Sequence, residues 1–307
     1  MNRRQFLSMA GAFAGSTGSA FAFTAPDAPP FIRSLVIVDL DGGNDGLNTV
    51  IPIDDPLYRV LRPGLAVPKD RALTLDRRTA LHPSLLPLMS AWHAGDMAIV
   101  QGVGHAAPNC SHYRSRQIWD TASDTHEYRS DGWLARVSNL PAADVVETGP
   151  FVASCKAAAR LIPTRTATVM RLTLHGFDTH ENQAPRHASL LAQFAEGLAL
   201  LRASLMGSGD WSRTLVMTRS DFGRSARENA AGGTDHGSAA PHFLMGGMVR
   251  GGVFGAPPLL DQLDDAGGLP VGIDFRRLCA TVLHANGVID STSILGQRFE
   301  PLPLLRV

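Results

Sequence analysis

Short apolar segments alternate with longer segments of helical periodicity along most of this chain, and this alternation restricts the fold more than any other feature. Strands are expected at residues 34–40, 97–101, 168–174 and 214–218, with a shorter one at 242–245. Helices are expected at residues 83–93, 186–206 and 275–285. Strands that alternate with helices usually form a mostly parallel sheet covered on both faces. The sequence therefore predicts an α/β fold with a doubly wound, mostly parallel sheet.

Two segments have a weaker pattern. Between Trp119 and Arg165 a helix is expected only in DGWLARVSN, with loop around it. The glycine-rich stretch at 246–255 is expected to form turns or a hairpin, because apolar residues are interleaved with its glycines.

The composition fits a single domain at residues 34–307. The chain has 307 residues, of which 44% are hydrophobic and 18% charged, so it can bury a sizeable core. Its formal net charge is zero and it has no run of Lys and Arg, which argues against nucleic acid or an anionic membrane surface as partner. We therefore expect a small molecule or another protein.

The first residues have the layout of an export signal. Arg3 and Arg4 precede a short apolar stretch that ends in small residues and an Ala-x-Ala site, Ala20-Phe21-Ala22. The arginine pair followed by Phe-Leu is typical of the twin-arginine type. We expect a signal peptide at 1–22, a linker at 23–33, export by the twin-arginine machinery to the periplasm or outside the cell, and no membrane span in the mature chain. The alternative is an ordinary amphipathic N-terminal helix.

Acidic residues and histidines follow four of the expected strands, those at 34–40, 97–101, 168–174 and 214–218. In an open α/β sheet, ligands bind outside the carboxyl ends of the strands, so these side chains are expected to share one site. Carboxylates and imidazoles are ligands for Zn²⁺ and, on the harder side, for Mg²⁺, Mn²⁺ or Ca²⁺. The predicted metal ligands are Asp45, Asp178, His180, Asp235, His236 and His242. Asp39 is expected to be structural and Asp41 to support the site, whereas His187 is expected on a helix surface and not as a ligand.

Ser111 is the predicted nucleophile, with His112 and Asp221 as further catalytic residues. Ser111 lies in a loop before a helix whose N–H groups could face an anionic oxygen. No G-x-S-x-G motif surrounds it, which disfavours a standard α/β-hydrolase. Each motif also has a structural interpretation: Ser111 and Asp178 as helix caps, Asp221 as a strand-end cap, and Asp235-His236-Gly237 as a turn.

Other residue types leave alternatives open. Arg114 and Arg116 could pair with phosphate or sulfate oxygens, or be solvated helix charges. Cys110 is a weaker nucleophile candidate, and an oxidising compartment would permit a Cys110–Cys155 bridge that the sequence cannot establish. Cys279 is expected to be buried packing.

Several motifs occur in an order that resembles a known family. They are GGNDGLNTVIP, LHPSLLPLMSAWHAGDMAIVQGVG, PNCSHYRSRQIWDTA, GFDTHENQ, SDFGR, GTDHGSAAPHFLMGGMVRGG and FRRLCATVL. Together with the arginine-pair signal, they resemble the DUF1501 family of exported bacterial proteins, which is grouped with the alkaline phosphatase and sulfatase-like superfamily. The resemblance implies an alkaline-phosphatase-like core, a site for one or two metal ions, and a Ser or Thr nucleophile that acts on phosphate or sulfate esters. Through it Asp45, Ser111, Asp178, His180, Asp235, His236 and His242 acquire their expected roles.

The leading hypothesis is an exported, metal-dependent hydrolase of small phosphate or sulfate esters. A second hypothesis is a non-catalytic exported binding or assembly protein with a structural ion. A third is a metal-free hydrolase that uses Ser111 and His112, which is disfavoured because adjacent residues on a helix point in different directions.

Overall fold

The computed structural model describes residues 31–105, 110–138 and 140–306. The predicted signal peptide and the linker as far as residue 30 lie outside these residues, so both remain predictions.

The centre of the molecule is a mostly parallel sheet with the strand order β10-β5-β9-β8-β1-β7-β6, and β11 pairs with β5. The strands are β1 (Ser34–Asp41), β5 (Met97–Gly104), β6 (Ala143–Val145), β7 (Thr168–His175), β8 (Thr214–Ser220), β9 (Ala240–Met245), β10 (Gly252–Phe254) and β11 (Ile273–Asp274). Among these described strands, β9 alone runs antiparallel, to both β5 and β8. The predicted mostly parallel α/β sheet is confirmed.

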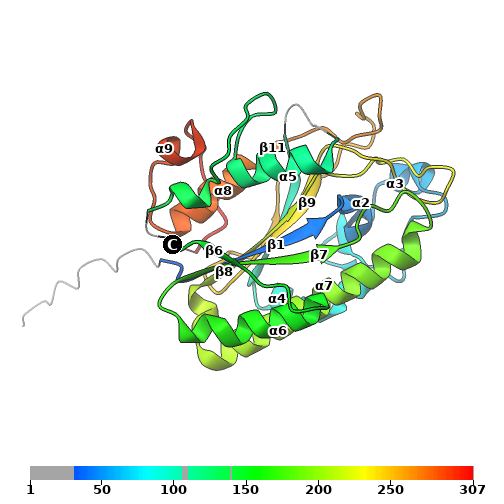
Figure 1. Cartoon of the computed structure of the whole chain (residues 1–307). Coiled ribbons are helices and arrows are strands. Elements are labelled where there is room, and N and C mark those ends of the chain that lie inside the picture. Colours follow the sequence, from blue (N-terminus) through cyan, green and yellow to red (C-terminus); the bar gives the residue numbers. More distant parts are fainter. Residues whose placement is uncertain (1–30, 106–109, 139, 307) are drawn as a thin grey trace, which may run out of the picture.

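Helices cover both faces of this sheet (Figure 1). One layer holds α4 (Met89–His93), α6 (Phe151–Leu161) and α7 (Gln183–Ser208), and the other holds α5 (His112–Thr121), α8 (Arg276–Ala285) and α9 (Thr292–Leu295). Strand β1 shows why both layers are needed. Its Val36 and Val38 lie in the first core, whereas Leu35 and Ile37 lie in the second. Successive side chains of a strand point to opposite faces, so a strand that is apolar throughout must be covered on both sides.

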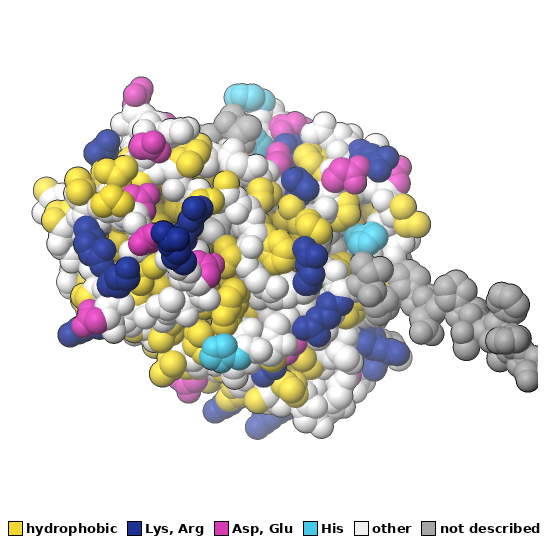
Figure 2. Space-filling model, turned by 180° about the vertical axis from the view of Figure 1, so that it is seen from behind, with side chains coloured by type: hydrophobic (Ala, Val, Ile, Leu, Met, Phe, Trp, Pro, Cys, Tyr) yellow, Lys and Arg dark blue, Asp and Glu magenta, His cyan; other side chains and the backbone are white. Residues whose placement is uncertain are grey.

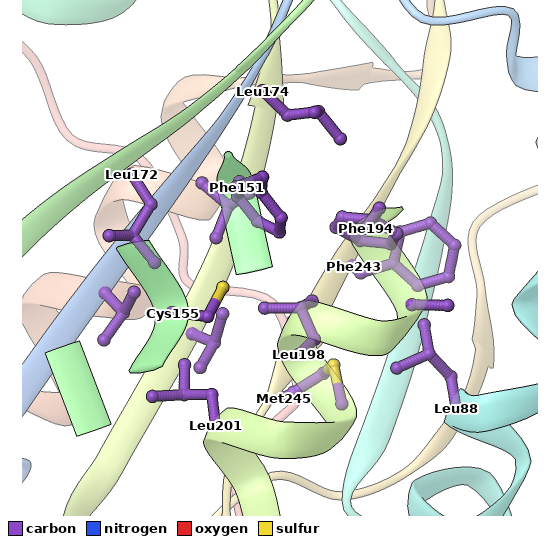
Figure 3. Close-up of a cluster of buried hydrophobic side chains, with 14 of the residues drawn as sticks. Leu88, Phe151, Cys155, Leu172, Leu174, Phe194, Leu198, Leu201, Phe243 and Met245 are labelled. Carbon is purple, nitrogen blue, oxygen red and sulfur yellow. The ribbon is translucent and has the colours of Figure 1, made fainter. Parts of the chain in front are cut away.

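The core under α7 is built from aromatic and branched side chains, some of which Figure 3 shows. There α6 and α7 approach closely at Gly197, where a Cβ would lie 2.8 Å from both the Cys155 sulfur and the Phe151 ring. Helix α7 is also long and apolar enough to cross a membrane by length and composition alone. In the structure its Leu191, Phe194 and Leu198 are buried in this core.

A small antiparallel sheet, β2-β4-β3, lies beside the main one. Its strands are β2 (Val50–Pro52), β3 (Leu73–Thr74) and β4 (Thr79–Leu81), and the region after β1 also contains the short helices α2 (Gly46–Thr49), before β2, and α3 (Pro56–Leu61), between β2 and β3. On the surface, Figure 2 shows basic and acidic side chains interspersed over the face it displays.

Two sequence expectations need correction, and a third is confirmed. The glycine-rich stretch forms a turn at Gly247 and Met248, as expected, and no β9–β10 hairpin, because these two strands lie on opposite sides of β5. The segment expected to be loop contains α6, an 11-residue helix, whereas DGWLARVSN contributes only the 3₁₀ turn η2 (Leu134–Arg136). The segment 83–93 is a 3₁₀ helix, η1 (Pro83–Leu88), followed by α4, since Pro87 lacks the N–H that a regular helix needs.

Candidate metal centre

The sheet brings four loops to one edge. Strands β1, β7 and β8 are parallel and in register, with Asp41 opposite His175 and Leu40 opposite Ser220, so they end at the same level. The loops that follow them carry Asp178, Asp221 and His236, and α5 begins at His112 after β5, which β9 separates from β8. Side chains that are more than 100 residues apart in sequence therefore meet, as in the contact between His112 and Asp221.

Three side chains form the centre of this edge. One ligand-type atom from each of His112, Asp178 and His236 lies within 4.8 Å of the other two. Asp178 is shared: its Oδ1 is 3.3 Å from His236 Nε2, and its Oδ2 is 3.5 Å from His112 Nε2. His180 adjoins this group, with its Nε2 3.0 Å from Asp178 Oδ1. A tetrahedral zinc ion would hold two ligands about 3.3 Å apart, which is close to these spacings.

The other ring nitrogen of each histidine is anchored. His112 Nδ1 lies 2.7 Å from Asp221 Oδ2, His180 Nδ1 lies 3.2 Å from Asp235 Oδ1, and His236 Nδ1 lies 3.0 Å from the backbone oxygen of Cys110. A carbonyl or carboxylate oxygen accepts, so each Nδ1 is assigned the proton that it donates. This fixes the tautomer and leaves Nε2 with its lone pair directed at Asp178, the usual arrangement behind metal-binding histidines.

The Nε2 lone pairs of the three histidines face one another and Asp178, and a cation would be a suitable partner for them. The Nε2 atoms of His180 and His236 are 3.0 Å apart, and neither has a proton to share if both Nδ1 atoms donate. Burial lowers the pKa of His236, and the hydrogen bond with Asp178 only partly offsets this. Among the described residues, the buried Nε2 of His112 has no hydrogen-bond partner, whereas His180 Nε2 has Arg224 Nη1 at 3.4 Å. A positive ion between these nitrogens would satisfy all of them.

Phe222 forms an apolar wall for the two inner rings. Its ring centroid lies 4.8 Å from that of His112 and 4.4 Å from that of His236. Gly43 packs on the other side, where a Cβ would be 2.9 Å from the Phe222 ring. An apolar wall lowers the local dielectric, which strengthens interactions between charges in the site.

Arg224 connects the loops that follow β1, β7 and β8 through hydrogen bonds. Its guanidinium group is fully buried and donates to the backbone oxygens of Gly42, Gly43, Phe177 and Thr234. It also lies 2.5 Å from Asp178 Oδ1. Partial burial opposes ionisation of Asp178, but the hydrogen bond and charge of Arg224, together with His236 and His112, outweigh it and lower the pKa of Asp178 to about 2. Asp178 is therefore an anion at any physiological pH.

Two predicted ligands lie elsewhere. The buried Asp45 pairs with the guanidinium of Arg62 at 2.6 Å and accepts from Gln183, so both partners separate it from the histidines. Burial raises the pKa of Asp45, but the charge and hydrogen bond of Arg62, with smaller contributions from His187 and Gln183, bring it below its ordinary value. His242 lies inside β9, with Nδ1 3.1 Å from the Thr218 oxygen and its ring against Trp119. The structure therefore does not bring Asp45 or His242 to the centre.

The remaining predicted aspartates support the histidines. Asp221 and Asp235 contact the Nδ1 atoms of His112 and His180 respectively, rather than the common point. Asp41 pairs with Arg116 and His175, and Asp39 forms a buried ion pair with Arg219. His187 was expected on a helix surface but is buried, because it faces the sheet and lies 2.9 Å from Asn44 Oδ1.

Ser111 is the N-cap of α5, and its hydroxyl accepts from the Arg114 backbone N–H at 3.5 Å. It stands between Cys110, whose oxygen holds His236, and His112. Arg114 is buried and holds the backbone at residues 124–127, whereas Arg116 is 44% exposed one turn after His112. Cys110 and Cys155 are both free, and burial raises the pKa of each thiol, for Cys155 to about 12. This weakens the case for a Cys110 nucleophile.

The sequence of this chain matches the model of one known protein family. The model of the family described as "Protein of unknown function (DUF1501)" matches residues 134–298, which include Asp178, His180, Arg224 and His236. The chain belongs to this family. The predicted resemblance is thereby confirmed, while no curated protein matches the DUF1501 chain.

Solved structures show the fold of the DUF1501 chain in other proteins. The lipoteichoic acid synthase LtaP from Listeria monocytogenes has a TM-score of 0.50 and 10% identity, covering 89% of this chain and 78% of that one. A protein in the alkaline phosphatase superfamily from Vibrio parahaemolyticus has a TM-score of 0.47 and 10% identity, covering 88% and 70%. The C-terminal periplasmic domain of EcEptC from Escherichia coli has a TM-score of 0.48 and 9% identity, covering 89% and 90%. The likeness to LtaP shows that the DUF1501 chain shares the fold of that protein, in agreement with the predicted α/β architecture.

Sequence reasoning missed the roles of two residues in this DUF1501 protein. Arg224 stands in SDFGR only three residues after Asp221, and nothing in that motif indicates that its side chain reaches Asp178. Arg62 gives even less signal, because it follows Asp45 by 17 residues in a segment without a motif. Both are arginines that neutralise a predicted metal ligand. The arginines of the sequence, as possible charge partners of the predicted aspartate ligands, were the signal that could have pointed to them.

Proposed function

We propose that this protein is an exported hydrolase of small phosphate or sulfate esters that depends on a divalent metal ion. His112, Asp178 and His236 would hold the ion, with His180 beside them. The observation that carries the proposal is that each histidine is anchored through Nδ1 while its Nε2 faces the Asp178 carboxylate. Surface histidines without a ligand have no reason to be fixed in this way.

The donor set favours zinc. Imidazole nitrogens suit Zn²⁺, whereas Mg²⁺ and Ca²⁺ prefer sites made entirely of oxygen, and Mn²⁺ lies between them. Three protein ligands leave a position open, which is typical of catalytic rather than structural zinc. When bound, such an ion draws charge from the oxygens of an ester and lowers the pKa of a hydroxyl beside it.

The chain would supply the nucleophile and the binding of the anion. Ser111 is the candidate nucleophile, because the residues on either side of it both contact the histidine cluster. At the N-terminus of α5 it lies beside backbone N–H groups that favour negative charge. Arg116 is exposed on the same helix face as His112 and is held by Asp41, so it can pair with ester oxygens. Asp221 would orient His112.

Export belongs to the proposal as well. The arginine pair and the Ala-x-Ala site in residues 1–22 support transport by the twin-arginine machinery to the periplasm or outside the cell. Replacing Arg3 and Arg4 together by Lys should retain the unprocessed chain inside the cell. Unchanged export of that variant in a cell fractionation assay would contradict this part.

Metal analysis of the folded protein tests the function. We expect bound zinc after supplementation, its loss in Asp178→Asn and His236→Gln, and hydrolysis of a p-nitrophenyl phosphate or sulfate that stops when zinc is removed. Ser111→Ala should lose turnover by at least about 100-fold while keeping its metal. Stable folded protein that binds metal but turns over no ester in a broad screen would favour the exported binding protein. Absence of metal, with no effect of chelators, would refute the metal-dependent function.

A further inference from the structure

The charges around Asp178 bear on how many ions the centre can hold. A two-ion centre needs carboxylates that bridge or flank the ions, in addition to histidines. The edge of the sheet is rich enough in aspartate to suggest such a centre. A second ion can bind there only if some of these carboxylates are not already paired with other groups.

The described carboxylates around Asp178 already have cationic or N–H partners. Asp221 Oδ2 accepts from His112 Nδ1 and from the Gly42 backbone N–H at 3.2 Å. Asp235 Oδ1 accepts from Asn229 Nδ2 and faces His180 Nδ1, each at 3.2 Å. Asp41 uses one oxygen for Arg116 and the other for His175. Asp45 is fully buried with its Oδ2 paired with Arg62, while its Oδ1 has no hydrogen-bond partner among the described residues. In Asp178 the oxygen Oδ1 is held by Arg224, and Oδ2, which lies 3.5 Å from His112 Nε2, remains for an ion.

Arg224 is placed where a further cation would have to bind Asp178. Its Nη2 is 2.5 Å from Asp178 Oδ1, and its Nη1 is 3.4 Å from His180 Nε2. Backbone oxygens of Gly42, Gly43, Phe177 and Thr234 surround the same guanidinium group, whose side chain is fully buried. It cannot swing out, because that would leave four buried carbonyl groups without a donor.

We propose that the centre binds a single divalent ion and that the buried guanidinium group of Arg224 takes the place of a second cation. This inference rests on the proposed function, because it presupposes one ion among His112, Asp178 and His236. Four carbonyl oxygens and a carboxylate form an oxygen cage of the kind that otherwise holds Ca²⁺. In this protein the cage holds a positive group that is part of the chain, and its charge repels another ion.

Counting ions gives the first test. The full chain, loaded with excess Co²⁺ and desalted, should contain one ion per chain by elemental analysis, and its electron paramagnetic resonance spectrum should show isolated Co²⁺. Asp41→Asn and Asp235→Asn should keep that count at one. Two ions per chain, a spin-coupled pair, or a count that falls from two to one in either variant would overturn the inference and leave the metal-dependent function intact. A count of zero would instead refute the proposed function and the inference with it.

Removing the guanidinium group from this oxygen cage by substitution tests whether Arg224 takes the place of a cation. Arg224→Ala should be less stable than the wild type and should gain thermal stability from millimolar Ca²⁺ or from low millimolar guanidinium, whereas the wild type should gain none from Ca²⁺. Arg224→Lys keeps the charge and should likewise be insensitive to Ca²⁺. Equal responses of wild type, Arg224→Ala and Arg224→Lys to Ca²⁺ would overturn the assignment. If Arg224→Ala does not fold, the ion count of the wild type decides.

Discussion

Single residues decide which members of this edge can act as ligands. His236 and His180 are each held by a hydrogen-bond partner on Nδ1. By contrast, the charge of Asp45 is neutralised by Arg62, and His242 is a buried residue within strand β9. The sequence indicates that acid and imidazole collect after the strands, and this holds for Asp178, His180, Asp221, Asp235 and His236. It could not show which of them have an arginine of their own, because pairing partners such as Arg62 and Arg224 come from other segments whose positions depend on the complete fold.

Asp221 should matter through His112. In Asp221→Asn the side-chain amide can donate to His112 Nδ1, which would move the ring proton to Nε2 and remove a lone pair from the centre. We expect the affinity for zinc to fall by about 10- to 100-fold, measured by competition with a chromophoric chelator. Asp41→Asn, a nearby carboxylate without contact to these histidines, is the matched control. Equal affinities of both variants would contradict the orienting role of Asp221.

At the level of helices and strands, periodicity predicted the elements with strong patterns and missed those without them. The apolar strands β1, β5, β7 and β8 and the long helix α7 were expected. Helix α6 was not expected, although its alanine-rich sequence FVASCKAAARL does have an apolar and a polar face; its Cys155 and Phe151 pack against Gly197 of α7. The antiparallel direction of β9 could not be predicted either, since strand direction depends on the path of the chain and not on residue type.

Gly42 is a test of the loop after β1. It has a φ of 113°, and a Cβ would lie 2.4 Å from the Asp178 backbone nitrogen. Gly42→Ala should therefore displace the segment that carries Asp178, cost about 1–3 kcal/mol of unfolding free energy, and weaken metal binding. Gly207→Ala, near the end of α7 with open space around it, should be neutral or stabilising by up to about 1 kcal/mol. Urea unfolding and metal titration would check both. Intact metal binding in Gly42→Ala would show that the loop has more room than the structure indicates.

For the whole molecule, the buried histidines set a limit on acid stability. Burial lowers the pKa of His242 to about 4, against an ordinary value of 6.5, although its hydrogen bond to Thr218 acts in the opposite direction. His187 is likewise lowered to about 4 by burial. Both are neutral in the folded chain above that pH, whereas the unfolded chain begins to take up protons below about 6.5.

Stability should therefore fall as the pH drops from about 6.5 to 4, by up to about 3 kcal/mol for each histidine, and should show no such loss above 6.5. His242→Gln can still donate to Thr218 but cannot titrate. We expect the slope of its unfolding free energy against pH, measured with urea at several pH values in this range, to be smaller than that of the wild type by about 1.4 kcal/mol per pH unit. Parallel curves for the two proteins would contradict the burial of a neutral His242.

The loop between β8 and β9 has one more consequence. It carries His236, the Asp235 that holds His180, and the Arg224 that holds Asp178. One opening of this loop would release an ion from several contacts at once. The exchange rate of a bound ion would then follow the motion of a single segment rather than the basicity of any ligand.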